Sequence, residues 1–198
     1  MGSTNRILTV PNVMSMVRLA CIPLFLYLLF GRDNVVAAAF LLGGLGATDW
    51  IDGYVARRFN QVSELGKVLD PTADRLMFIV SLVSIIIYSA GPAWFYWLVL
   101  IREVGFGAIV FIATLAGMKR FDVTWWGKLA TFLLMFAIPG LMLGSADWPP
   151  HALFNVAAWM LAIPGIIISY ATAIAYIPVI RRNLRQGRLE RSARAGAA

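Results

Sequence analysis

Six apolar stretches, each about as long as a bilayer is thick, constrain this chain more than any other feature of its sequence. A helix needs roughly 20 largely apolar residues to cross the hydrocarbon core. Of the 198 residues, 60% are hydrophobic and only 14% are charged, whereas charged residues make up about 25% of a soluble domain. A soluble or disordered protein is therefore excluded, and we expect an all-α integral membrane protein. The six predicted transmembrane helices are Val13–Phe30, Val35–Val55, Leu69–Ser89, Trp94–Gly117, Trp125–Gly144 and Ala152–Ile180.

The basic residues lie on one side of this predicted bundle. They occur before the first span, in the second-to-third and fourth-to-fifth connections and after Ile180, whereas the opposite connections carry only Arg32, beside Asp33. The positive-inside rule then places both termini in the cytoplasm. We expect a multi-pass membrane domain over residues 1–180 and a basic cytoplasmic tail over 181–198. The net charge of +7 points to membrane lipids as partners and not to nucleic acid.

Acidic residues inside predicted spans are the strongest functional signal, because such charges are costly in a membrane. Asp49 and Asp52 are three residues apart near the end of the second span, and Asp70 and Asp74 are four apart near the start of the third. Each pair therefore shares one helix face. The short connection makes the two helices antiparallel neighbours, so the four carboxylates are expected to converge at the cytoplasmic boundary.

Four carboxylates at this spacing need counter-charges, which either arginines or metal ions could supply. A structural ion-pair network with Arg57, Arg58 and Arg75 is one interpretation. The other is a metal centre, because an all-oxygen set without His or Cys suits Mg²⁺ or Mn²⁺, and two such ions promote displacement at a diphosphate. Gly53, Ala56 and Gly66 lack bulk where a phosphate or nucleotide would approach the backbone.

The pattern D-x2-D-G-x2-A-R-x8-G-x3-D-x3-D, from Asp49 to Asp74, resembles the CDP-alcohol phosphotransferase signature at every position. The resemblance extends to Pro11 and Asn12 before the first span and to the six-helix layout. It implies a CDP-alcohol phosphotransferase-like bundle that forms a homodimer, with a cytoplasm-facing site for two Mg²⁺ ions, or Mn²⁺ in their place. It also implies an enzyme that transfers the phosphatidyl group of CDP-diacylglycerol to an acceptor hydroxyl and releases CMP.

The resemblance also implies a role for each motif residue. Asp49 and Asp70 would bridge both metals, Asp52 would complete one metal and Asp74 the other, and Asp74 would also take the proton of the acceptor. The residues expected to contact the CDP-lipid are Pro11, Asn12, Gly53, Ala56, Arg57, Ser63 and Gly66.

The segment from Asn5 to Asn12 resembles that of bacterial members whose acceptors contain glycerol, so we expect an enzyme of a bacterial cell membrane. Glycerol-3-phosphate would give phosphatidylglycerophosphate, and phosphatidylglycerol would give cardiolipin. Relatives that use glycerol-3-phosphate tend to carry Lys after the last aspartate and a second Arg along the fourth helix. This chain has Arg75, and no cation between Arg102 and Lys119. We therefore predict that phosphatidylglycerol is the acceptor.

Four cations are candidates for the acceptor site, namely Arg18, Arg75, Arg102 and Lys128. Three of them have a second interpretation. Arg102 could form a self-neutralising pair with Glu103 inside the bundle, Arg18 could snorkel to the surface and Lys128 could anchor its helix at the interface. If all four converged, they would instead form a phosphate pocket suited to glycerol-3-phosphate.

Two other classes of protein can also place acids within spans. Ion-coupled transporters do so, but their sites tend to lie at the midplane between repeated halves, whereas these acids lie at one edge and the sequence shows no repeat. A structural membrane protein would leave the four carboxylates unexplained. The sequence therefore favours the enzyme.

Overall fold

The computed structural model describes residues 10–59, 66–118 and 124–195, and the side chains within 15–48, 73–118 and 124–187. All regular structure in these ranges is helical, so the predicted all-α class is confirmed. A short π-helix, η1 (Tyr27–Gly31), continues the first α-helix. The α-helices are α1 Val10–Leu26, α2 Val35–Phe59, α3 Gly66–Tyr88, α4 Ala93–Leu115, α5 Trp125–Ser145 and α6 His151–Ala195.

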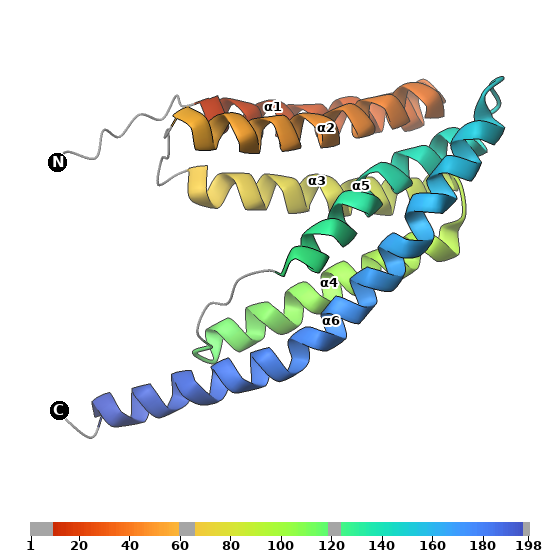
Figure 1. Cartoon of the computed structure of the whole chain (residues 1–198). Helices are drawn as coiled ribbons and strands as arrows, with labels where there is room; N and C mark the ends of the chain where they lie inside the picture. Colours follow the sequence, from red (N-terminus) through yellow and green to blue (C-terminus); the bar gives the residue numbers. More distant parts are fainter. Residues whose placement is uncertain (1–9, 60–65, 119–123, 196–198) are drawn as a thin grey trace.

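The six α-helices pack in a closed ring of neighbours. In order around the ring, α1 contacts α2, α2 contacts α5, α5 packs along α6, α6 contacts α4, α4 contacts α3, and α3 returns to α1. The start of α1, the end of α2, the start of α3 and the end of α6 lie at one end of the molecule, on the left of Figure 1. The ends of α2 and α3 that carry the aspartate motif therefore lie at the same end of the molecule, and the two helices run antiparallel. The prediction that they are neighbours is not confirmed, because α1 lies between them in the ring and contacts both.

The turns at the opposite end follow from local chemistry. The side-chain oxygen of Asn34 accepts a hydrogen bond from the backbone N–H of Ala37 at 2.9 Å, which caps α2. Gly91 adopts a φ of 118°, and a Cβ there would lie 2.7 Å from the Tyr96 hydroxyl, so only glycine fits this turn before α4. The Tyr88 hydroxyl donates to Asp33 and thereby links the end of α3 to the turn before α2.

Helices α5 and α6 approach each other closely because small residues line their contact. A Cβ on Gly140 would lie 2.9 Å from the Cβ of Ala158, and one on Gly144 would lie 2.7 Å from the Cα of Asn155. Small residues at this four-residue spacing allow close helix contact in membrane proteins. We call this contact, around Gly140 and Gly144, the α5–α6 seam. It holds α6 against α5, which in turn contacts α2.

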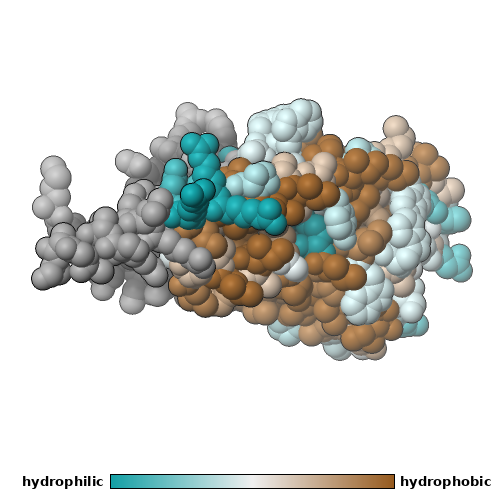
Figure 2. Space-filling model, turned by 90° about the horizontal axis from the view of Figure 1, so that it is seen from below, coloured by the Kyte–Doolittle hydropathy of each residue, from teal (hydrophilic) through white to brown (hydrophobic). Residues whose placement is uncertain are grey.

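In the described part of the chain, three helical segments are long and apolar enough to cross a membrane, namely α4, α5 and His151–Gly187 of α6. Two shorter apolar segments are Ser15–Gly31 and Val35–Thr48. Figure 2 shows apolar residues across much of one face, with hydrophilic residues mainly toward its two ends. Large apolar side chains of α4, such as Phe111 and Leu115, are exposed. This surface fits a membrane protein.

Helix α6 is longer than the predicted sixth span. It runs without interruption from His151 to Ala195, through Pro164, Pro178 and the end predicted at Ile180. At 1.5 Å per residue its 45 residues extend about 68 Å, which is more than twice the thickness of a hydrocarbon core of about 30 Å. The basic segment after Ile180 therefore continues the helix as far as Ala195.

Candidate active site

The aspartate motif covers the end of α2 and the start of α3, which lie at the same end of the molecule. Asp49 and Asp52 lie in α2, and Asp70 and Asp74 lie in α3; of these four side chains, the structure describes that of Asp74. The other predicted CDP-lipid residues lie in helices but have side chains outside the described set, and Ser63 lies outside the described residues altogether. Those in helices are Pro11 and Asn12 in α1, Gly53, Ala56 and Arg57 in α2, and Gly66 in α3.

Asp74 forms an ion pair with Arg18 of α1, in which the Arg18 Nη1 donates to the Asp74 Oδ1. The Arg18 side chain is 9% exposed, whereas that of Asp74 is 40% exposed. The carboxylate is therefore held from the α1 side and open on another. Sequence reasoning assigned Arg18 to the acceptor and did not find this contact, which joins residues 56 positions apart.

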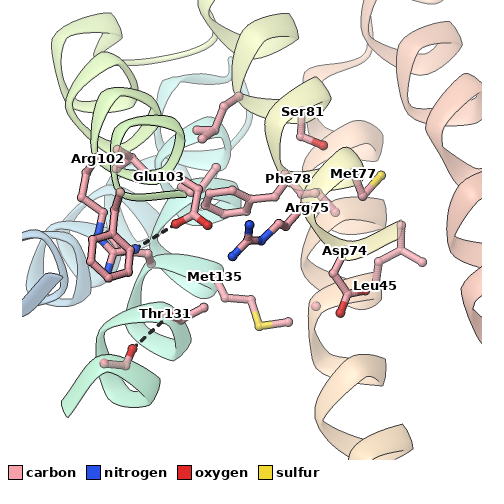
Figure 3. Close-up of a pocket in the computed structure, with 18 of the residues that line it drawn as sticks. Leu45, Asp74, Arg75, Met77, Phe78, Ser81, Arg102, Glu103, Thr131 and Met135 are labelled. Atoms are coloured by element: carbon pink, nitrogen blue, oxygen red, sulfur yellow. Dashed lines mark hydrogen bonds and ion pairs between the residues drawn. The ribbon is translucent and has the colours of Figure 1, made fainter. Parts of the chain in front are cut away.

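A cavity of about 520 Å³ extends from Asp74 into the ring of helices. All six α-helices contribute to its lining, and Figure 3 shows α2, α3, α4 and α5 around it. The charged residues among its described lining are Arg18, Asp74, Arg75, Arg102 and Glu103. Three of the four candidate acceptor cations therefore meet at one cavity. Lys128 is exposed on α5 and is not part of the lining.

Arg102 and Glu103 are neighbours in α4 and pair with each other. The Arg102 Nη1 donates to the Glu103 Oε2 at 2.8 Å, and the side chains are 11% and 26% exposed. The Arg102 guanidinium also lies 5.5 Å from the ring centroid of Phe106, within cation–π range. The Nε of Arg102 is buried and has no hydrogen-bond partner in the described part of the chain. The guanidinium therefore keeps a donor for a ligand.

Arg75 extends from α3 toward α4, and Figure 3 shows its guanidinium directed into the cavity. A Cβ built on Gly107 of α4 would lie 3.6 Å from the Arg75 Nη1, so the side chain reaches across the gap. No hydrogen bond or ion pair joins Arg75 to the other side chains that the structure describes. A guanidinium has five N–H donors, which suits Arg75 for binding an anion.

Beyond these charges the cavity is mainly apolar. Its lining there includes Leu45 of α2, Leu82 of α3 and Met135 and Ile138 of α5. Ser81 is an exception that the sequence did not single out: it is 2% exposed, and its hydroxyl has no partner among the described atoms. The cavity is thus amphipathic, with a charged part beside Asp74 and an apolar part that can receive hydrocarbon.

One further contact secures the edge of the cavity. The backbone N–H of Thr124 donates to the Tyr176 hydroxyl at 2.6 Å, and the two hydroxyls are 2.9 Å apart. Tyr176 lines the cavity, so this contact holds the start of α5 against α6 next to it. Nothing in the sequence signalled the pairing, because the residues are 52 positions apart.

The donor set of the motif fits a hard divalent cation. Asp74 presents a partly exposed carboxylate at the cavity, and Asp70 precedes it by one helical turn in α3. Among the described side chains, no three His, Cys, Asp or Glu residues are grouped so that they could hold a metal ion, and the side chains of Asp49, Asp52 and Asp70 lie outside that set. Carboxylate oxygens without nitrogen or sulfur are the ligands that Mg²⁺ prefers.

Several known proteins are similar to this chain over most of its length. The family model for CDP-alcohol phosphatidyltransferase matches residues 8–176. A protein of Streptomyces coelicolor named cardiolipin synthase (CMP-forming) is 38% identical over 92% of this chain and 87% of the relative. Two proteins named CDP-diacylglycerol–glycerol-3-phosphate 3-phosphatidyltransferase also match. That of Haemophilus influenzae is 27% identical over 88% of this chain and 95% of the relative, and that of Bacillus subtilis is 32% identical over 67% and 76%.

Proposed function

Because this chain belongs to the CDP-alcohol phosphatidyltransferase family, an enzyme family of phospholipid biosynthesis, we propose that it transfers the phosphatidyl group of CDP-diacylglycerol to phosphatidylglycerol. The products are cardiolipin and CMP. The observation that carries the choice of acceptor is the cavity, which joins Asp74 and three arginines to a mainly apolar interior. A lipid acceptor needs both parts, one for its phosphodiester and one for hydrocarbon. The name of the Streptomyces coelicolor relative supports the same choice.

In the proposed reaction these groups have the following roles. The carboxylate of Asp74 accepts the proton of the acceptor hydroxyl, whose oxygen bonds to the phosphorus that carries diacylglycerol. The bond from this phosphorus to the bridging oxygen breaks, and CMP leaves with that oxygen. Arg75 and Arg102 hold the acceptor phosphate through charge-assisted hydrogen bonds. Arg18 keeps the Asp74 carboxylate in place, and a positioned base of this kind contributes about 10²–10⁴-fold to the rate.

We further propose that Asp49, Asp52, Asp70 and Asp74 hold two Mg²⁺ ions, for which Mn²⁺ could substitute. The ions would neutralise the diphosphate of the CDP-lipid. The residues that would hold this substrate are those of the motif and of the start of α1: Pro11, Asn12, Gly53, Ala56, Arg57, Ser63 and Gly66. Their support is the exact spacing of the motif and the family match over residues 8–176.

The proposal includes six membrane-spanning helices with both termini and the active site on the cytoplasmic side of a bacterial cell membrane. Two observations support this orientation. Successive helices run in opposite directions in Figure 1, and most cations lie in the segments at the end of the molecule that carries the aspartate motif. The homodimer implied by the family resemblance is part of the same proposal.

Glycerol-3-phosphate, with phosphatidylglycerophosphate as product, is the second candidate. Two relatives carry the name of that activity, and three arginines face one cavity, which would suit a phosphate monoester. Two observations weigh against it. Lys128 is not part of the lining, and the carboxylate of Glu103 is.

An acceptor screen tests the proposal. Purified protein with CDP-diacylglycerol and Mg²⁺ receives either phosphatidylglycerol or glycerol-3-phosphate, and the lipid products are identified by mass spectrometry. We expect cardiolipin from phosphatidylglycerol. Rapid formation of phosphatidylglycerophosphate, with no cardiolipin, would replace the proposal by the second candidate.

A further inference from the structure

We propose that Glu103 makes the enzyme selective for the charge of its acceptor, by favouring a singly charged phosphodiester over a doubly charged phosphate monoester. The inference rests on the proposed function, in that the cavity is taken as the acceptor site. Glu103 is a specificity residue in this proposal and takes no part in the chemical step.

The first argument is the balance of charge around the cavity. Its described lining contains three arginines (Arg18, Arg75 and Arg102) and two acids (Asp74 and Glu103), so its formal charge is 3 − 2 = +1. Without the carboxylate of Glu103 the balance would be +2. A phosphodiester carries one negative charge, whereas a phosphate monoester carries about −1.5 to −2 at neutral pH. The balance with Glu103 therefore matches the phosphodiester.

The second argument is the place of the carboxylate. Figure 3 shows Glu103 between the side chains of Arg102 and Arg75 in that view, and the Glu103 Oε2 accepts a hydrogen bond from the Arg102 Nη1 at 2.8 Å. A phosphate that approached both arginines would meet this carboxylate and compete with it for Arg102. The repulsion grows with the charge on the phosphate. A monoester is therefore repelled about twice as strongly as a diester.

The third argument concerns the accessibility of the pair. Consecutive residues on a helix do not face each other, so the Arg102–Glu103 contact is not a consequence of helix geometry alone. The Glu103 side chain is 26% exposed and belongs to the cavity lining. Its charge therefore acts on whatever occupies the cavity. A pair that served packing alone would affect stability and leave the choice of acceptor unchanged.

Replacement of Glu103 by glutamine keeps the shape of the side chain and removes its charge. We expect Glu103→Gln to raise kcat/KM for glycerol-3-phosphate relative to phosphatidylglycerol by about tenfold, or about 1.4 kcal/mol. The change should lie mainly in KM for glycerol-3-phosphate, because Glu103 affects binding and not proton transfer. High salt should reduce it, since Glu103 is partly exposed and its charge is screened.

The experiment is a competition. Full-length enzyme in mixed micelles receives CDP-diacylglycerol, Mg²⁺ and both acceptors together, and the ratio of phosphatidylglycerophosphate to cardiolipin is measured by mass spectrometry. The ratio does not depend on how much of each variant is folded. Glu103→Asp keeps the charge and should keep the wild-type ratio. Asp147→Asn makes the same charge change in the exposed turn between α5 and α6 and should also keep it.

A second variant tests the charge balance without changing the Arg102–Glu103 pair. Thr131 of α5 lines the cavity, so Thr131→Lys adds a positive charge and should move the ratio in the same direction as Glu103→Gln. An unchanged ratio in both variants, or an equal shift in Asp147→Asn, would overturn the inference. If the wild-type enzyme makes no cardiolipin, the proposed function fails instead, so the two failures are distinct.

Discussion

The carboxylate of Asp74 accepts a hydrogen bond from Arg18 with one of its oxygens, and it also lines the cavity. If Asp74 is the base, Asp74→Asn should lower turnover by about 10²–10⁴-fold. The variant should still bind CDP-diacylglycerol, because one ligand of one proposed metal is changed and three aspartates remain. Product assays combined with a CDP-diacylglycerol binding measurement check both parts, and wild-type turnover would contradict the role of Asp74 as base.

Arg18 is expected to act through Asp74. Arg18→Met should lower kcat by about 10–100-fold, the usual effect of losing a group that orients a functional residue. Arg18→Lys keeps the charge and should retain more activity. In the Asp74→Asn background, Arg18→Met should cost little more, because residues that act as a unit are not additive. A full additional loss in that background would show that Arg18 has a separate role, such as direct contact with the acceptor.

Among the contacts between helices, the α5–α6 seam should tolerate a larger residue poorly. Gly144→Ala places a Cβ 2.7 Å from the Cα of Asn155, a backbone atom that cannot rotate away, so we expect a loss of about 1–3 kcal/mol in stability. Gly44→Ala in α2 is the matched control, because its Cβ meets nothing within 4 Å. Thermal unfolding in detergent checks the pair, and an equal midpoint for both variants would contradict the packing of the seam.

The helices, and the antiparallel direction of consecutive helices, could be predicted because apolar stretches and short connections are local features of the sequence. Apolar length indicates spans, and the spacing of Asp49, Asp52, Asp70 and Asp74 indicates which residues share a helix face. Which helices face one another is a different question, and helical periodicity does not answer it. The Arg18–Asp74 pair joins α1 to α3 across 56 positions. The position of Lys128 outside the cavity likewise depends on the orientation of α5, which no spacing in the sequence specifies.

The same limit applies to Arg102 and Glu103. Their charges within an apolar span signalled either a packing pair or an acceptor site, and the structure shows features of both. The side chains pair with each other, and both line the cavity. A sequence cannot decide between the two interpretations, because the answer depends on whether the packing of α3, α4 and α5 leaves a cavity beside these two side chains.

For the whole molecule, the proposed orientation predicts the sides on which the two parts of α6 are reached. His151 lies at the start of this helix and Arg185 beyond its apolar segment, and both are exposed. In a Cys21→Ser background, a membrane-impermeant maleimide should label His151→Cys in intact cells, because the proposed orientation places this residue on the outer side. It should label Arg185→Cys only after permeabilisation. Labelling in the reverse pattern would place the site on the outer side.

The central claim is that a phosphatidyl group from CDP-diacylglycerol joins an intact phosphatidylglycerol. The most direct measurement gives the purified enzyme CDP-diacylglycerol and phosphatidylglycerol with different acyl chains, with Mg²⁺, and follows lipid products and CMP by mass spectrometry. The account predicts cardiolipin that carries one pair of chains from each substrate, in equal amount to CMP, and neither product when EDTA is in excess. Cardiolipin with chains from phosphatidylglycerol alone, or its formation without CMP, would contradict the account.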